Sequence, residues 1–249
     1  MTKFTIALAG RNICVSSEFP AVQYYCRDYL TEGPADFSVQ VLQQHIEFER
    51  QKSAREDLIE GRPVQEYAPG YLATLAAYRQ IAEGMLNFDT FLFHGSAVSV
   101  DGQGYLFTAK SGTGKSTHTR LWREHFGARL VTVNDDKPLL KVTDNQVLVC
   151  GTPWDGKHRI SSNVMVPLKG ICILRRGQEN RIRPVSVPEA LPLLLQQSYR
   201  PRNPQALAKL LELVDKTTKL TGLYVLECNM DPEAALVAYR GMSGKEETL

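Results

Sequence analysis

The stretch Tyr105-Leu106-Phe107-Thr108-Ala109-Lys110-Ser111-Gly112-Thr113-Gly114-Lys115-Ser116-Thr117 decides the fold of this 249-residue chain. Its first four residues, mostly apolar, predict a strand, and a helix is predicted from Thr117 to Phe126. The glycines between strand and helix let the backbone wrap closely around an anion. The backbone N–H groups of the loop and of the first helical turn would then point at phosphate oxygens. The segment therefore predicts a phosphate-binding loop.

The side chains of this loop suggest which phosphate compound it binds. The Lys115 ammonium can reach terminal phosphates, and the Ser116 hydroxyl is placed to bind Mg²⁺. The usual pattern begins with glycine, whereas a small residue, Ala109, stands there in this chain. We therefore expect a nucleoside triphosphate and Mg²⁺ to bind. The predicted nucleotide-binding residues are Ser111, Gly112, Thr113, Gly114, Lys115, Ser116 and Thr117.

A second polar group follows the next predicted strand, Arg129–Val133. Asn134-Asp135-Asp136 stands at the C-terminal end of this strand, which is where α/β sheets place their sites. In phosphoryl transfer, one carboxylate can hold Mg²⁺ while another accepts a proton from the attacking hydroxyl. The double Asp is therefore the candidate for this chemistry.

The strand that enters the loop has a predicted antiparallel neighbour. Phe91–Val100 has the composition of a strand, and Asp101-Gly102-Gln103-Gly104 predicts a turn from it into Tyr105–Thr108. In the common nucleotide-binding folds, the strand entering the loop starts a parallel unit. The hairpin instead predicts an α/β protein with a mixed sheet. It also places His94 on the strand next to the loop.

The rest of the chain predicts two parts, an N-terminal α+β portion of residues 1–88 and a core of residues 89–249. The first part could bind an acceptor, form a dimer face or only complete the fold, and we favour acceptor binding. Its predicted elements are Phe4–Leu8, Ile13–Val15, Pro20–Leu30, Phe37–Val41, Ile46–Glu60 and Tyr71–Leu86. Further elements predicted for the core are Leu139–Val142, Val147–Val149, Ile171–Leu174, a helical stretch Pro188–Leu220 and Leu223–Glu227.

Composition narrows the class of partner. The chain has 29 basic and 27 acidic residues, so its net charge of +2 gives no general attraction to nucleic acid or to a membrane surface. It has no apolar run of about 18 residues. Its five cysteines are scattered and form no CxxC, which favours a reducing compartment. We expect a cytoplasmic protein, and a homo-oligomer stays open.

Three of these motifs together carry a family resemblance. His94-Gly95 at the start of a hairpin, the run Ser111–Ser116 and Asn134-Asp135-Asp136 resemble HPr kinase/phosphorylase. The Ser-Gly-Thr-Gly-Lys run and the double Asp also resemble the kinase motifs of ATP-dependent phosphoenolpyruvate (PEP) carboxykinase, which shares that fold. The resemblance covers Phe91–Leu174 and is closest to small bacterial HPr-kinase-like proteins, some of which phosphorylate a serine on a ribosomally made peptide. It implies an ATP- and Mg²⁺-dependent kinase acting on a serine hydroxyl of a peptide or protein.

The resemblance also implies roles for single residues. Asp135 corresponds to the catalytic base and Asp136 to a metal-site partner, and His94 would lie near the transferred phosphate. The signature segment Glu-Ile-Arg-Gly-Leu-Gly of the HPr kinases is replaced here by Gly151–Arg159, and Thr117 stands where they often have an acidic residue. These departures weaken the expectation that HPr is the acceptor.

Cations in and near the replacement segment are candidate contacts for phosphates or an anionic substrate. They are Lys137, Lys157 and Arg159. Two alternatives to a peptide or protein kinase stay open. One is a small-molecule kinase or a carboxykinase-like phosphotransferase, and the other is a regulator that binds the nucleotide without turnover.

Overall fold

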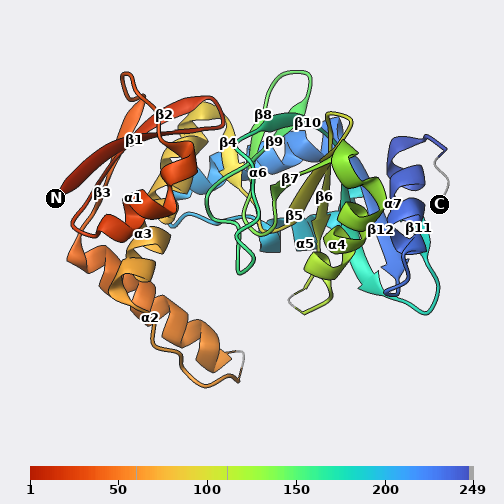
Figure 1. Cartoon of the computed structure of the whole chain (residues 1–249), viewed down its shortest axis with the longest axis horizontal. Coiled ribbons are helices and arrows are strands. Elements are labelled where there is room, and N and C mark those ends of the chain that lie inside the picture. Colours follow the sequence, from red (N-terminus) through yellow and green to blue (C-terminus); the bar gives the residue numbers. More distant parts are fainter. Residues whose placement is uncertain (60, 111, 247–249) are drawn as a thin grey trace. The chain divides into compact units, whose positions relative to one another are not determined.

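The computed structural model of the chain describes residues 1–59, 61–110 and 112–246. The chain divides into two compact units, Met1–Met85 and Leu86–Leu249, and each is described by itself. Both units combine helices with β-strands (Figure 1), so the protein has a mixed α/β architecture.

In the described part of the N-terminal unit, a three-stranded sheet is accompanied by the α-helices α1, α2 and α3. β1 and β2 are antiparallel, whereas β3 runs parallel to β2. The turn between β1 and β2 lies at Ala9 and Gly10, which both have a positive φ. The elements are β1 (Thr2–Leu8), β2 (Arg11–Ser17), α1 (Pro20–Tyr25), the 3₁₀ helix η1 (Arg27–Tyr29), β3 (Phe37–Val41), α2 (Gln43–Ile59) and α3 (Pro69–Met85).

Two predicted helices of this unit have different ends in the structure. The helix predicted over Pro20–Leu30 breaks at Cys26, whose φ of −96° and ψ of 10° leave the α-helical region, and a 3₁₀ turn follows. The helix predicted from Ile46 begins at Gln43. The His45 Nδ1 accepts a 3.1 Å hydrogen bond from the Leu42 backbone N–H, which satisfies a group that would otherwise lack a partner at a helix start.

The C-terminal unit is built on one large mixed sheet. The strand order is β4-β8-β9-β10-β6-β5-β7, and β12 and β11 continue from β10. β5 and β6 pair in the predicted antiparallel manner, and so do β8 and β9. The strands are β4 (Thr90–Leu92), β5 (Ser96–Val100), β6 (Gln103–Thr108), β7 (Leu130–Asn134), β8 (Leu139–Val142), β9 (Val147–Cys150), β10 (Met165–Arg176), β11 (Arg181–Pro184) and β12 (Gly222–Cys228).

Several strands of this sheet, among them β6, β7, β10 and β12, run in the same direction. β10 is parallel to both β6 and β12. β5 is antiparallel to both β6 and β7, so β6 and β7 also share a direction. The C-terminal ends of β6, β7, β10 and β12 therefore meet at one edge of the sheet, and α/β proteins bind ligands at this kind of edge.

Helices cover both faces of the sheet (Figure 1). Successive strand residues point to opposite faces. Tyr105 and Phe107 pack under α4 and α7, whereas Leu106 packs under α5 and α6. The predicted inward residues of α4, Leu121, Trp122 and Phe126, are buried. The α-helices are α4 (Lys115–Phe126), α5 (Val187–Gln197), α6 (Pro204–Leu220) and α7 (Glu233–Ser243), and two 3₁₀ helices are η2 (Leu86–Phe88) and η3 (Gly127–Arg129).

The prediction of one continuous strand over Phe91–Val100 was wrong. β4 ends at Leu92 and β5 begins at Ser96, so His94 lies in the connection between them. Gly95 explains the break, because a Cβ at this position would lie only 2.8 Å from the Phe107 carbonyl oxygen. The chain leaves the strand here, and the Gly95 N–H donates a 2.9 Å hydrogen bond to the Asp136 carbonyl oxygen.

Candidate phosphoryl-transfer site

The glycine-rich segment after β6 has the backbone geometry of an anion-binding loop. Gly112 and Gly114 have φ values of +74° and +116°, which side chains with a Cβ rarely adopt. The Thr113 hydroxyl donates to the Lys110 carbonyl oxygen at 2.7 Å and tightens the turn between them. Ser111, predicted to bind the nucleotide, lies outside the described residues.

Ala109, which replaces the usual first glycine, is fully buried. Its methyl group belongs to the apolar cluster that contains Tyr105, Phe107 and Trp122. The departure from the motif therefore has a packing role, because the methyl fills space between the sheet and α4.

α4 begins at Lys115, two residues before the predicted start. Its N-cap residue is Gly114, and among the described residues no side chain caps this end of the helix with a hydrogen bond. The first N–H groups of a helix have no partners within the helix, and the helix dipole makes them an attractive site for an anion. Lys115, Ser116 and Thr117 thus belong to the first turn, next to the loop.

Lys115 lies within the electrostatic reach of the double Asp. Partial burial lowers the pKa of Lys115, and the negative charges of Asp136 and Asp135 oppose this shift. The structure therefore brings the lysine that follows β6 and the carboxylates that follow β7 to one place, as the shared edge of their strands requires.

Asn134 fixes the turn that carries the two carboxylates. Its Oδ1 accepts hydrogen bonds from the backbone N–H groups of Asp136 (2.9 Å) and Lys137 (2.6 Å). Its Nδ2 donates to the carbonyl oxygen of Thr152 at 2.9 Å. The buried amide thus ties the end of β7 to the segment after β9.

Asp135 is buried, with 6% of its surface exposed. Its Oδ1 accepts a 3.1 Å hydrogen bond from the Thr119 hydroxyl of α4. Its carbonyl oxygen accepts a 2.9 Å hydrogen bond from the Ser96 hydroxyl. The helix that starts at the phosphate loop therefore holds this carboxylate directly.

Asp136 lies between the Lys137 ammonium and the His94 ring, which is a cation when protonated. The His94 Nε2 lies 3.2 Å from Asp136 Oδ1, and the Lys137 ammonium pairs with Oδ2. Burial alone raises the pKa of Asp136, but the His94 hydrogen bond and the Lys137 charge outweigh burial and hold the pKa well below its usual range. Asp136 is therefore ionised over the physiological pH range.

The loop Gly151–Arg159 lies beside Asp136. A Cβ on Gly156 would come within 3.0 Å of the Asp136 Cβ. Arg159, which has a φ of +54°, donates to the Pro153 carbonyl oxygen at 2.9 Å and lies 3.2 Å from Asp155 Oδ1. The structure thus ties Arg159 to its own loop, whereas Lys157 is exposed on the same loop.

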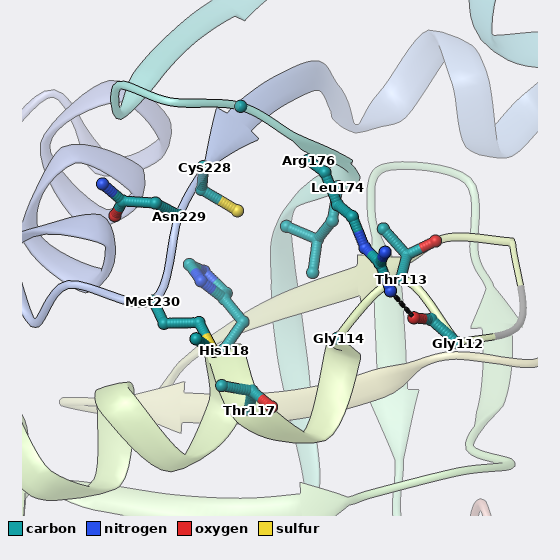
Figure 2. Close-up of a pocket in the computed structure, with 11 residues that line it drawn as sticks. Gly112, Thr113, Gly114, Thr117, His118, Leu174, Arg176, Cys228, Asn229 and Met230 are labelled. Carbon is teal, nitrogen blue, oxygen red and sulfur yellow. Dashed lines mark hydrogen bonds between the residues drawn. The ribbon is translucent and has the colours of Figure 1, made fainter.

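The sequence prediction missed a cavity on the other side of the phosphate loop (Figure 2). It has a volume of about 530 Å³ and lies between the loop, α4 and the ends of β10 and β12. His118 of α4 faces it. His118 is three residues after Lys115, and this helical spacing was the available signal.

The described residues contain no group of three or more His, Cys, Asp or Glu side chains that could hold a metal ion. None of the helices in the described ranges has the length and apolarity to cross a bilayer.

No protein-family model matches the chain, and no curated protein sequence matches it. Among solved structures, the chain is similar to the HPr(Ser) kinase/phosphatase from Coxiella burnetii, with 11% sequence identity and a TM-score of 0.33. The match covers 59% of this chain and 91% of that one.

Proposed function

We propose that this chain is a kinase that transfers the γ-phosphate of ATP to a hydroxyl group, and that the hydroxyl belongs to a serine of a peptide or protein. One observation carries the proposal. Lys115 in the phosphate loop and the carboxylates of Asp135 and Asp136 are close enough for their charges to interact. A cation for the phosphates and carboxylates beside it are the parts that phosphoryl transfer requires.

The surroundings of each side chain would decide its role in the transfer. Lys115 and the N–H groups of the first α4 turn would hold the terminal phosphates. Asp135 would accept the proton of the attacking hydroxyl. Asp136 is a poor proton acceptor, because His94 and Lys137 hold its pKa low. Most of the rate enhancement would then come from positioning and electrostatics.

The oxygen donors suit Mg²⁺ that arrives with the nucleotide. Protein sites for nucleotide-bound Mg²⁺ use one or two side-chain oxygens together with phosphate oxygens. The exposed hydroxyl of Ser116 and the ionised carboxylate of Asp136 are such a pair. When bound, the ion would supply positive charge that offsets the charge of the phosphates.

For the acceptor, we propose a peptide segment bound by the N-terminal unit. β3 forms an edge of the sheet in that unit, and an extended peptide can add to a sheet edge through backbone hydrogen bonds. Lys137 and Lys157 are the candidates for contacts to an anionic acceptor. Photo-crosslinking with acceptor peptides tests this idea, and crosslinks confined to the C-terminal unit would contradict it.

The decisive assay follows radiolabelled γ-phosphate from ATP to a panel of HPr, free serine, other small hydroxyl compounds and candidate precursor peptides. Transfer to the small compounds alone would favour a small-molecule kinase. ATP binding without transfer to any acceptor, including water, would favour a nucleotide-binding regulator.

Asp135→Asn tests the base. A general base contributes roughly 10²–10⁴ in rate, so turnover should fall by about this factor while ATP binding persists. Asp144→Asn changes an exposed Asp in the β8–β9 turn and is the matched control. Transfer at the wild-type rate in Asp135→Asn would rule out Asp135 as the base.

A further inference from the structure

The cavity beside the phosphate loop lies apart from the double Asp. The loop and the first turns of α4 form one wall, through Gly112, Gly114 and Thr117 among others. The ends of β10 and β12 form the opposite wall, and Arg176 of β10 donates a 2.7 Å hydrogen bond to the Gly112 carbonyl oxygen. A ligand whose phosphates lie in the loop can therefore extend its other end into this cavity.

The protonation of His118 follows from its partner. The Trp122 Nε1–H donates a 3.0 Å hydrogen bond to His118 Nε2, and an indole nitrogen can only donate. Burial holds the pKa of His118 at about 3, so the ring is neutral at physiological pH. With Nε2 as the acceptor, the single proton of the neutral ring must be on Nδ1.

The Nδ1–H of His118 is a donor without a partner. The residue is only 3% exposed, and no described residue accepts a hydrogen bond from Nδ1. Buried donors are almost always paired, because an unmade hydrogen bond costs free energy. Figure 2 shows the ring directed from α4 into the cavity, toward Cys228. A bound group with an acceptor atom would satisfy this donor.

The rest of the lining suits a largely apolar group. Leu174 and Met230 contribute apolar side chains, and Met230 is 76% exposed at the cavity mouth. Burial raises the pKa of the Cys228 thiol, so it carries no charge at neutral pH. Asn229 is occupied elsewhere, since its Nδ2 donates to the Gln178 carbonyl oxygen and to Asp231. Thr117 and Arg176 also line the cavity, and His118 contributes a buried polar group that can select the ligand.

We propose that this cavity binds the purine base of the nucleotide, and that His118 Nδ1–H donates a hydrogen bond to one of its ring nitrogens. The proposal rests on the proposed function, because the phosphate loop must hold the same nucleotide. The volume of about 530 Å³ falls in the range of small-ligand pockets and leaves room for a bicyclic base with its ribose. A purine combines a flat apolar body with acceptor nitrogens at its edge.

The first test replaces one ring nitrogen of ATP at a time by C–H. Calorimetry with 1-deaza-, 3-deaza- and 7-deaza-ATP should show roughly tenfold weaker binding for one analogue, because one hydrogen bond is lost. In His118→Phe, this analogue and ATP should bind with equal affinity. His125→Phe makes the same change on the same helix and should keep the discrimination. Equal affinities of all three analogues and ATP for the wild type would overturn the proposal.

The second test uses Cys228 and needs no variant. Of the five cysteines, the other four are buried, whereas Cys228 is partly exposed and lines the cavity. ATP should slow the alkylation of Cys228, measured by mass spectrometry, whereas inorganic tripolyphosphate should not. Equal protection by both compounds, or by neither, would mean that no base occupies the cavity.

The two proposals fail differently. If neither ATP nor tripolyphosphate binds, the proposed function itself is wrong. If both bind with the same affinity and the deaza analogues match ATP, the phosphate loop functions and the base-binding cavity does not.

Discussion

Replacing Ala109 by the glycine that is usual in a phosphate-binding loop should destabilise this protein. Ala109 is fully buried in the apolar cluster under α4. Ala109→Gly removes one buried methyl, worth about 0.8 kcal/mol, and adds backbone freedom to the unfolded chain, worth about 0.4–1 kcal/mol. The free energy of unfolding should therefore fall by about 1–2 kcal/mol, which corresponds to a Tm lower by about 2–8 °C.

Urea unfolding of the whole chain measures this effect. Ala128→Gly is the matched control, because Ala128 is exposed and its replacement contributes only the backbone part. ATP affinity should stay within about twofold in Ala109→Gly, since the methyl faces the cluster and the glycines at 112 and 114 shape the loop. A variant as stable as the wild type would refute the packing role of Ala109.

Two further substitutions, Asp136→Asn and Gly95→Ala, test the site through stability, and Gly102→Asn is the control for the second. Asp136→Asn should lose about 1.5–3 kcal/mol at pH 7, the usual value of hydrogen bonds to a charged group. Because the folded pKa of Asp136 is lowered, its stabilisation is present above the unfolded pKa near 4 and is lost as the pH falls through the acid range. Wild type and variant should therefore converge in stability in acid urea titrations, and a gap that persists at low pH would contradict the ionic origin. Gly95→Ala should lose about 1–3 kcal/mol in thermal unfolding, since its Cβ would press on the backbone at Phe107. Gly102→Asn at the open β5–β6 turn should cost only a few tenths of a kcal/mol, because Asn tolerates a positive φ.

Local sequence signals predicted the elements that depend on nearby residues. The strand, loop and helix around Lys115 follow from glycine and lysine at fixed spacing. The β8–β9 hairpin follows from two apolar runs joined by Asp144-Asn145. In each case, the residues that determine the element lie within about ten positions of each other, so a short stretch of sequence is enough to predict it.

The features that the sequence did not predict depend on distant residues. The break at Gly95 is set by the backbone of Phe107, which belongs to another strand. β11 was missed because Arg181 and Arg183 hide its strand pattern, and its partner β12 lies some 40 residues later. The spacing of His118 from Lys115 indicates which face of α4 it lies on, but not its burial, because the end of β12 closes its cavity.

The two residues of the double Asp lie in different surroundings, although they have the same side chain. Asp135 and Asp136 are identical side chains and neighbours in sequence, but the turn at Asn134 sends them into different surroundings. Asp135 is buried against the neutral Thr119 hydroxyl, whereas Asp136 lies between His94 and Lys137. Active sites assign different roles to two carboxylates by placing them in different surroundings.

Under the proposed function, Asp135→Asn and Asp136→Asn should therefore impair different steps of the reaction. The first should lower turnover at any Mg²⁺ concentration, and the second should raise the Mg²⁺ concentration needed for half-maximal transfer. Identical effects of the two substitutions would mean that the carboxylates act as one unit.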